Sequence, residues 1–218
     1  MQGLNLVQKI ILFAPPVLLA VTLHEVAHGA VARYFGDRTA EMLGRLTINP
    51  LKHIDPIGTI AVPVGMLVLG LPFIFGWARP VPVATRNLRK PRRHMVYVAA
   101  AGPAANLLMA LGWAVLIKIV LILGLADTAA FSAVLMMASF GITINVFLAV
   151  LNMLPIPPLD GGRVASGLLP PRLSTTMDQI EPYGLLIILG LMFAGVLWPI
   201  MMPLIDGTTG LIQALTGL

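Results

Sequence analysis

Long apolar runs alternate with short polar segments along the chain. From residue 10 to residue 32 the only charged side chain is Glu25, and three further apolar runs cover residues 95–125, 129–154 and 183–205, with an acidic link at Asp127 between the second and third runs. At 1.5 Å per residue, a helix of each run reaches the roughly 30 Å of a hydrocarbon core. The pattern therefore predicts about four transmembrane helices.

Residues 57–75 form a shorter apolar run that glycines and prolines interrupt. The loops on both sides of it are rich in Lys and Arg, and the positive-inside rule places both loops on the cytoplasmic side. This favours a re-entrant segment that lines a cavity, because irregular backbone at membrane depth needs protein or water around it. A full crossing is the alternative. The re-entrant topology leaves only Lys9 and Lys118 outside the cytoplasmic loops.

Two short segments beside this run, residues 43–48 and 78–83, alternate partly between apolar and polar side chains. They are predicted as small β-strands near the cavity, with ordinary surface loops as the alternative. The expected fold is an all-α polytopic membrane protein in which residues 1–218 form a single domain. We expect the first run to be a retained span rather than a signal peptide, since polar His24, Glu25 and His28 interrupt it before any cleavage site.

Composition supports a membrane protein, with 58% hydrophobic and 11% charged residues and a mean hydropathy of +0.92. A soluble domain has about 25% charged residues. The net charge of +5 fits positively charged cytoplasmic loops. We therefore expect the protein to lie in a lipid bilayer and to bind no nucleic acid. There is no cysteine, so any metal ligands are His, Asp or Glu.

The sequence His24-Glu25-Val26-Ala27-His28 lies inside the first apolar run. Two histidines four positions apart lie on one helix face and can bind one Zn²⁺, with Glu25 beside an open coordination position. Ionisable side chains are costly within an apolar span, so their default interpretation is functional. Hydrogen bonding among themselves in the bundle core is the alternative.

A zinc site of this kind needs a third protein ligand, and Asp160 is the strongest candidate. It follows Pro155, Pro157 and Pro158, which end an apolar helix, and precedes Gly161-Gly162. These glycines free the backbone beside the carboxylate, so that the loop can return toward the first span. An ordinary turn is the alternative.

Together these motifs resemble the site-2 protease family of intramembrane zinc metalloproteases. The segment from His24 to His28 resembles its first catalytic motif, Gly102-Pro103-Ala104-Ala105-Asn106 a further helical motif, and Asn152 with Leu159-Asp160-Gly161 its second catalytic motif. The stretch from Gly44 to Pro50, with the residues that follow it up to Val83, resembles the compact branch of the family. The chain has no room for the PDZ or CBS domains of many relatives, so we expect no regulation by such modules.

The resemblance implies one Zn²⁺ per chain, held by His24, His28 and Asp160, with Glu25 as the catalytic base. The implied substrate is a transmembrane helix of another membrane protein. Its unwound backbone would pair with residues 43–48, and Asn106, Asn152 and Gly44 would contact it. Interhelical hydrogen bonding is the alternative for the two asparagines. We expect a multi-pass protein of the cell membrane, with the active site toward the cytoplasm.

A metal-ion or proton transporter that uses the same His/Glu/Asp cluster is the alternative function, because intramembrane ionisable groups also line ion paths. Paired broken helices in two corresponding halves, which many transporters have, are not visible. A catalytically inactive binding protein is a third hypothesis, and Glu25 argues against it because binding needs no base. His53 and His94 lie in basic loops. His53 is expected to be a solvated loop histidine, with a role as a fourth ligand or an inhibitory group as the alternative. The sequence predicts no oligomeric state.

Overall fold

Helices are the only regular elements in the part of the chain that this computed structural model describes, which is residues 5–70, 76–125 and 129–218. The elements are α1 (Leu6–Tyr34), α2 (Thr39–Met42), η1 (Pro50–Lys52), η2 (Pro56–Ala61), α3 (Val62–Val68), η3 (Thr85–Asn87), α4 (Pro91–Ile122), α5 (Ala129–Asn152), α6 (Asp160–Leu168), α7 (Pro171–Ile180), η4 (Glu181–Tyr183), α8 (Gly184–Phe193) and α9 (Leu197–Thr216).

Local sequence accounts for several helix starts. The Asn5 side chain accepts a hydrogen bond from the backbone N–H of Gln8, and the Gln8 side chain accepts one from the Asn5 N–H, which is a capping box at the start of α1. Pro91 occupies the first turn of α4, where its missing N–H costs nothing. Asp55 caps η2 by accepting from the backbone N–H groups of Ile57 and Gly58.

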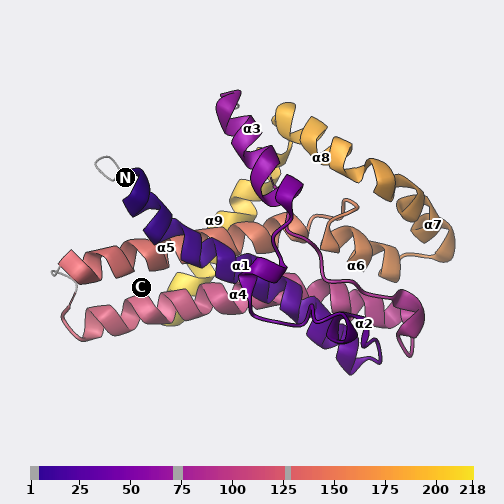
Figure 1. Cartoon of the computed structure of the whole chain (residues 1–218), viewed down its shortest axis with the longest axis horizontal. Helices are drawn as coiled ribbons and strands as arrows, with labels where there is room; N and C mark the ends of the chain where they lie inside the picture. The colour runs from indigo at the N-terminus through magenta and orange to yellow at the C-terminus, as the bar shows by residue number, and fades with distance from the viewer. Residues whose placement is uncertain (1–4, 71–75, 126–128) are drawn as a thin grey trace.

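Three long helices form the centre of the molecule. Figure 1 shows α4 and α5 side by side with α1 across them, and each pair of these helices is in contact. Many of the buried positions in the three helices carry alanine: Ala20, Ala32, Ala99, Ala110, Ala114, Ala138 and Ala149. Small residues let helix backbones approach closely, which is how helices pack in a membrane.

The same three helices are long and apolar enough to cross a membrane, over Val7–Tyr34, Pro91–Ile122 and Phe131–Asn152. They agree with the spans predicted at residues 10–32, 95–125 and 129–154. The Asp127 link between the last two lies outside the described residues.

The predicted fourth span, residues 183–205, is not one continuous helix. The segments Pro171–Phe193 and Leu197–Thr216 meet at an angle of 87°. At the break Gly195 has φ +70°, and the N–H of Val196 donates to the carbonyl of Leu191 at 3.0 Å. This is the left-handed glycine ending of a helix, which hydropathy does not reveal. Beyond the break, α9 packs against α4 and α5.

The interrupted run at residues 57–75 begins as η2 and continues as α3, and its last residues, 71–75, lie outside the described part. The apolar helix over Pro56–Met66 is too short to cross a hydrocarbon core by itself, since its 11 residues extend only about 16 Å. Figure 1 shows α3 standing apart from the three-helix bundle, and α3 packs mainly against η2.

The small strands predicted at residues 43–48 and 78–83 are not present in the described structure. Residues 43–48 form turns and bends, and residues 78–83 are irregular. The two segments do meet, but through the Arg45 side chain, whose Nη2 donates to the carbonyl of Arg79 at 2.8 Å. Pro80 and Pro82 carry no N–H, which prevents a regular ladder.

Candidate metal centre

The fold brings together three side chains from α1 and α6. Nε2 of His24 and Nε2 of His28 are 3.0 Å apart, and Oδ2 of Asp160 lies 3.1 Å from the first and 3.3 Å from the second. All three residues are buried, with 8–9% of their surface exposed. The predicted His24/His28/Asp160 cluster is therefore compact in the structure, and it could hold a metal ion.

The outer nitrogen of each imidazole is already occupied. Nδ1 of His28 lies 2.7 Å from the carbonyl oxygen of Val98, which can only accept, so this nitrogen carries the proton. Nδ1 of His24 lies 2.6 Å from Oδ1 of Asn106 and donates in the same way. In the neutral imidazoles both Nε2 atoms then present lone pairs to each other and to a carboxylate. Such a convergence of lone pairs calls for a cation.

Zinc suits this donor set. Oδ2 of Asp160 is buried and accepts no hydrogen bond from any residue that the structure describes. Ligand atoms about 2.0–2.1 Å from a tetrahedral Zn²⁺ are roughly 3.3 Å from one another, close to the observed 3.0–3.3 Å. Two imidazoles and one carboxylate leave the fourth position open, as in catalytic zinc sites.

The α4 backbone lies directly against the two imidazoles. A Cβ at Gly102 would lie 2.6 Å from Cε1 and Nε2 of His24, and closer still to Nε2 of His28, so only glycine fits there.

One turn further along α4, Asn106 is fully buried. Its amide donates to the carbonyl of Ala20 at 3.2 Å and to Oδ1 of Asn145 at 2.9 Å. Asn145 was not predicted as a site residue, and its signal in the sequence is a polar amide inside the apolar run 129–154.

Asp160 reaches the cluster because α6 begins directly against the end of α5. A Cβ at Gly161 would collide with the carbonyl oxygens of Met153 and Leu154, and a Cβ at Gly162 would lie 2.5 Å from the Pro157 nitrogen. The two glycines therefore permit the return that the sequence predicted. Asp160 lies in the first turn of α6, where the helix dipole favours a carboxylate.

Glu25 is half-buried, and its Oε2 accepts a hydrogen bond of 2.7 Å from the backbone N–H of Val81. Val81 belongs to the irregular segment of residues 77–84, which we call the strap. A Cβ at Gly29, one turn along α1, would lie 3.0 Å from Cγ1 of Val81. The strap thus lies against the face of α1 that carries Glu25.

A family model described as Peptidase family M50 matches residues 12–195 of the chain. The chain belongs to this family, the site-2 proteases. In Bacillus subtilis (strain 168) the protein named "Putative zinc metalloprotease YwhC" is 43% identical over 190 residues, which cover 85% of this chain and 83% of that protein.

Two further relatives carry the name "Putative zinc metalloprotease Rip2". The protein of Mycolicibacterium smegmatis (strain ATCC 700084 / mc(2)155) is 33% identical over 181 residues, 80% of this chain and 64% of that protein. The protein of Mycobacterium tuberculosis (strain ATCC 25618 / H37Rv) is 29% identical over 181 residues, 81% of this chain and 64% of that protein. No solved structure matches the chain.

The chain is thus an intramembrane zinc metalloprotease, and nothing in the comparisons favours the transporter alternative.

Two other predicted site residues of this M50 protease, Asn152 and Gly44, lie at the end of α5 and in the turn after α2. Asn152 ends α5, and its amide donates to the carbonyl of Leu148 at 2.9 Å. Gly44 lies in the exposed turn after α2, with φ +63° and open space around its Cα. The prediction of a solvated His53 is wrong: it is 2% exposed, and its Nε2 lies 2.9 Å from the carbonyl oxygen of Thr47.

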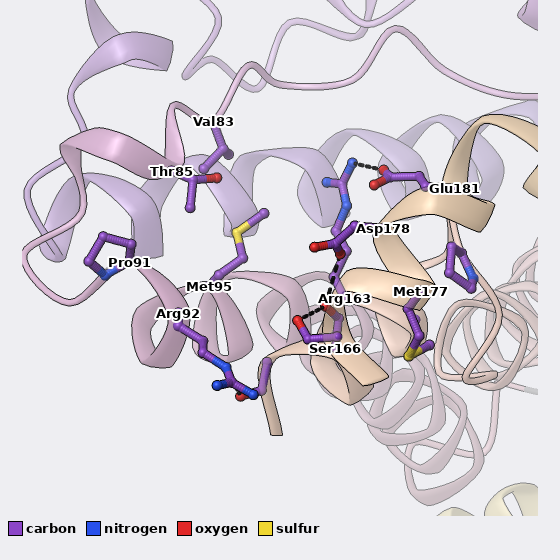
Figure 2. Close-up of a pocket in the computed structure, with 14 residues that line it drawn as sticks. Val83, Thr85, Pro91, Arg92, Met95, Arg163, Ser166, Met177, Asp178 and Glu181 are labelled. Atoms are coloured by element: carbon purple, nitrogen blue, oxygen red, sulfur yellow. Dashed lines mark hydrogen bonds and ion pairs between the residues drawn. The ribbon is translucent and has the colours of Figure 1, made fainter. Parts of the chain in front are cut away.

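Two cavities flank the strap of the protease. An apolar cavity of about 540 Å³ between α1, α5 and α9 is lined by Val21, Leu148, Trp77 and Ala78, among others. A second pocket of about 440 Å³ includes Val83 and is shown in Figure 2, where Arg163 and Glu181 form an ion pair of 3.1 Å. Along the strap, Trp77 and Ala78 line the apolar cavity and Val83 lines the second pocket. Val81, which donates to Glu25, lies between them in the sequence.

Proposed function

We propose that this M50 protease binds one Zn²⁺ per chain through His24, His28 and Asp160, and that it hydrolyses peptide bonds within or near transmembrane helices of other membrane proteins. The observation that carries the proposal is the buried triangle of two Nε2 atoms and one carboxylate oxygen, with edges of 3.0, 3.1 and 3.3 Å. The site is of the HExxH type, with Glu25 as the catalytic base.

Zinc bound there supplies a Lewis acid and lowers the pKa of water at the site. Glu25 accepts a proton from the water that attacks the substrate carbonyl carbon, and it returns that proton to the amide nitrogen as the C–N bond breaks. Its position on α1, next to His24 and on the strap side of the helix, supports this role.

Asn106 serves, in this proposal, to orient His24. The Asn106 side chain is fully buried, and its hydrogen bonds to His24, Ala20 and Asn145 leave it no access to a substrate. Asn152, at the end of α5, and Gly44, in the exposed turn, remain proposed substrate contacts.

The proposed substrate segment enters the apolar cavity beside α1, in an extended form that exposes its carbonyl groups. That cavity includes Val21 and Thr22, which immediately precede the HExxH residues, and Leu148 and Leu151 near the end of α5. An apolar lining suits side chains that come from a bilayer.

We further propose a multi-pass protein of the cell membrane whose active site lies toward the cytoplasm. Arg33 at the end of α1 and Arg92 and Arg93 at the start of α4 support this orientation, because positive side chains flank spans on the cytoplasmic side. The bent pair of α8 and α9 makes the fourth crossing, and the described part of the interrupted run, residues 57–70, belongs to a re-entrant segment.

The proposal is tested with purified wild-type protein and Glu25→Gln in detergent, by cleavage of a panel of single-span substrates and by the zinc content of both proteins. We expect zinc in both and cleavage only by the wild type. Glu41→Gln is a matched control, because Glu41 pairs with Arg33 and Arg38 away from the cluster. Wild-type turnover by Glu25→Gln would remove Glu25 as the base.

A further inference from the structure

The strap is held in place by hydrogen bonds from the backbone N–H groups of every second residue. The backbone N–H of Trp77 donates to the carbonyl of Gly58 at 3.1 Å, that of Arg79 to the carbonyl of His53 at 2.9 Å, and that of Val81 to Oε2 of Glu25 at 2.7 Å. These three backbone N–H groups, two residues apart along the strap, therefore all point toward the body of the protein. Only the last of these bonds reaches the proposed catalytic machinery.

The register of the strap against Glu25 is set by two prolines. Pro80 and Pro82 carry no N–H, so Val81 holds the only backbone donor within residues 80–82. A slip of one residue in either direction would put a proline opposite the carboxylate. The hydrogen bond to Glu25 can therefore form in only one register over these residues.

Arg45 holds the strap immediately beside this bond. Its Nη2 lies 2.8 Å from the carbonyl oxygen of Arg79 and 3.4 Å from that of Pro80. The Pro80 carbonyl and the Val81 N–H belong to one peptide group, which is planar and rigid. Arg45 and Glu25 thus contact opposite ends of the same peptide unit.

The arginine side chain is half-buried. Its Nε is shielded from solvent and has no hydrogen-bond partner among the described residues, so the hydrogen bonds that hold the guanidinium there are those to the two strap carbonyls. Because the guanidinium of Arg45 and the carboxylate of Glu25 contact opposite ends of this peptide group, opposite charges lie on the two sides of the strap.

We propose that Arg45 is a positioning residue for the peptidase reaction. By binding the carbonyls of Arg79 and Pro80, it fixes the Val81 N–H on Oε2 of Glu25. The carboxylate then keeps one orientation, and its other oxygen is left for the proton of the attacking water. This inference rests on the proposed role of Glu25 as the base.

A role in positioning predicts a specific kinetic change. Removing the side-chain partner that holds a catalytic group typically costs 10–100-fold, and a misplacement of about 1 Å can cost about 100-fold in rate. We expect Arg45→Gln to lower kcat about 10–100-fold. KM should change less than about twofold, because the substrate cavities keep their lining. The zinc content should equal that of the wild type, because Arg45 does not contact the cluster.

Hydrogen exchange tests the same contact without any turnover. Since Val81 carries the only amide hydrogen within residues 80–82, its exchange can be followed in peptides that cover the strap. Arg45→Gln should speed this exchange, and Arg45→Lys, which keeps one donor for the Arg79 carbonyl, should restore part of both the protection and kcat. Arg38→Gln is the matched control, since Arg38 is exposed and pairs with Glu41.

Wild-type kcat with wild-type exchange in Arg45→Gln would overturn the proposal. A rise in kcat would overturn it as well, because the strap would then obstruct the site. If Arg45→Gln fails to fold, Arg45→Lys provides the answer through the same two readouts. Failure of the proposed function is a separate result: Glu25→Gln would retain turnover, whatever the exchange at Val81.

Discussion

Gly102→Ala gives the sharpest structural test of the metal centre. The added methyl carbon would lie 2.6 Å from Cε1 and Nε2 of His24, whereas ordinary contact begins at 3.4 Å. The His24 ring must therefore move by about 0.8 Å, or α4 must withdraw from α1 by a similar amount. Either movement spreads the two Nε2 atoms relative to Asp160.

The expected loss follows from the tolerance of zinc coordination. Ligand distances in working sites agree with ideal values within about 0.2 Å, so a displacement of about 0.8 Å is far outside the tolerated range. We expect zinc affinity to fall at least 10–100-fold, the range seen when supporting groups of a metal site are removed. In free energy this is about 1.4–2.7 kcal/mol.

The assay is a titration of purified protein in detergent with a competing chromophoric zinc chelator, beside a cleavage assay. Gly112→Ala is the control on the same helix, because a Cβ at Gly112 meets nothing within 4 Å. It should bind zinc like the wild type and be slightly more stable, by about 0.5–1 kcal/mol. Wild-type zinc affinity in Gly102→Ala would refute the close packing of α4 on the imidazoles.

Three further predictions follow from single contacts. Asn106→Leu leaves the Nδ1 proton of His24 without its acceptor and should weaken zinc binding about 10–100-fold in the same titration; unchanged affinity would contradict the orienting role. Burial raises the pKa of Asp37, but hydrogen bonds from Thr39, Asn87 and Ala84 lower it by more than burial raises it. The net pKa of Asp37 therefore lies below its ordinary value. Its stabilisation is therefore present above about pH 4 and lost as the pH falls through the lowered pKa, so the wild-type Tm should drop in acid and the Tm of Asp37→Asn should depend less on pH. Gly195→Ala places a side chain at φ +70°, which should cost about 1–2 kcal/mol in thermal unfolding, whereas Gly190→Ala, which meets nothing within 4 Å in mid-helix, should not destabilise.

The catalytic motif could be predicted from sequence because its geometry is local. His24 and His28 lie four positions apart on one helix, and helical periodicity alone puts them on one face. Asp160 could be named as a third ligand because Gly161 and Gly162 mark a place where the chain can turn sharply back. The structure brings these three side chains within contact distance.

The partners of the imidazoles could not be predicted, because they depend on how α4 packs against α1. The carbonyl of Val98 and the amides of Asn106 and Asn145 reach the site across helices, and no spacing within one segment encodes that packing. From the sequence, Asn106 was accordingly expected to contact the substrate, with interhelical hydrogen bonding as the alternative, and Asn145 was not predicted.

The strap shows why local alternation misled the strand prediction. The backbone N–H groups of Trp77, Arg79 and Val81 do follow a period of two, but they donate to the carbonyls of Gly58 and His53 and to the Glu25 carboxylate rather than to a neighbouring strand. His53 was expected in solvent because its neighbours are basic and polar. It is buried because its ring binds the Thr47 carbonyl while its own carbonyl binds the strap.

The central claim is that His24, His28 and Asp160 hold a zinc ion, and X-ray absorption at the zinc edge of the purified protein tests it most directly. The account predicts about one zinc per chain, with imidazole scattering and only nitrogen or oxygen ligands near 2.0–2.1 Å. It also predicts loss of the bound zinc in Asp160→Ala. Absence of zinc from the wild type, or a zinc ion without imidazole ligands, would contradict the claim.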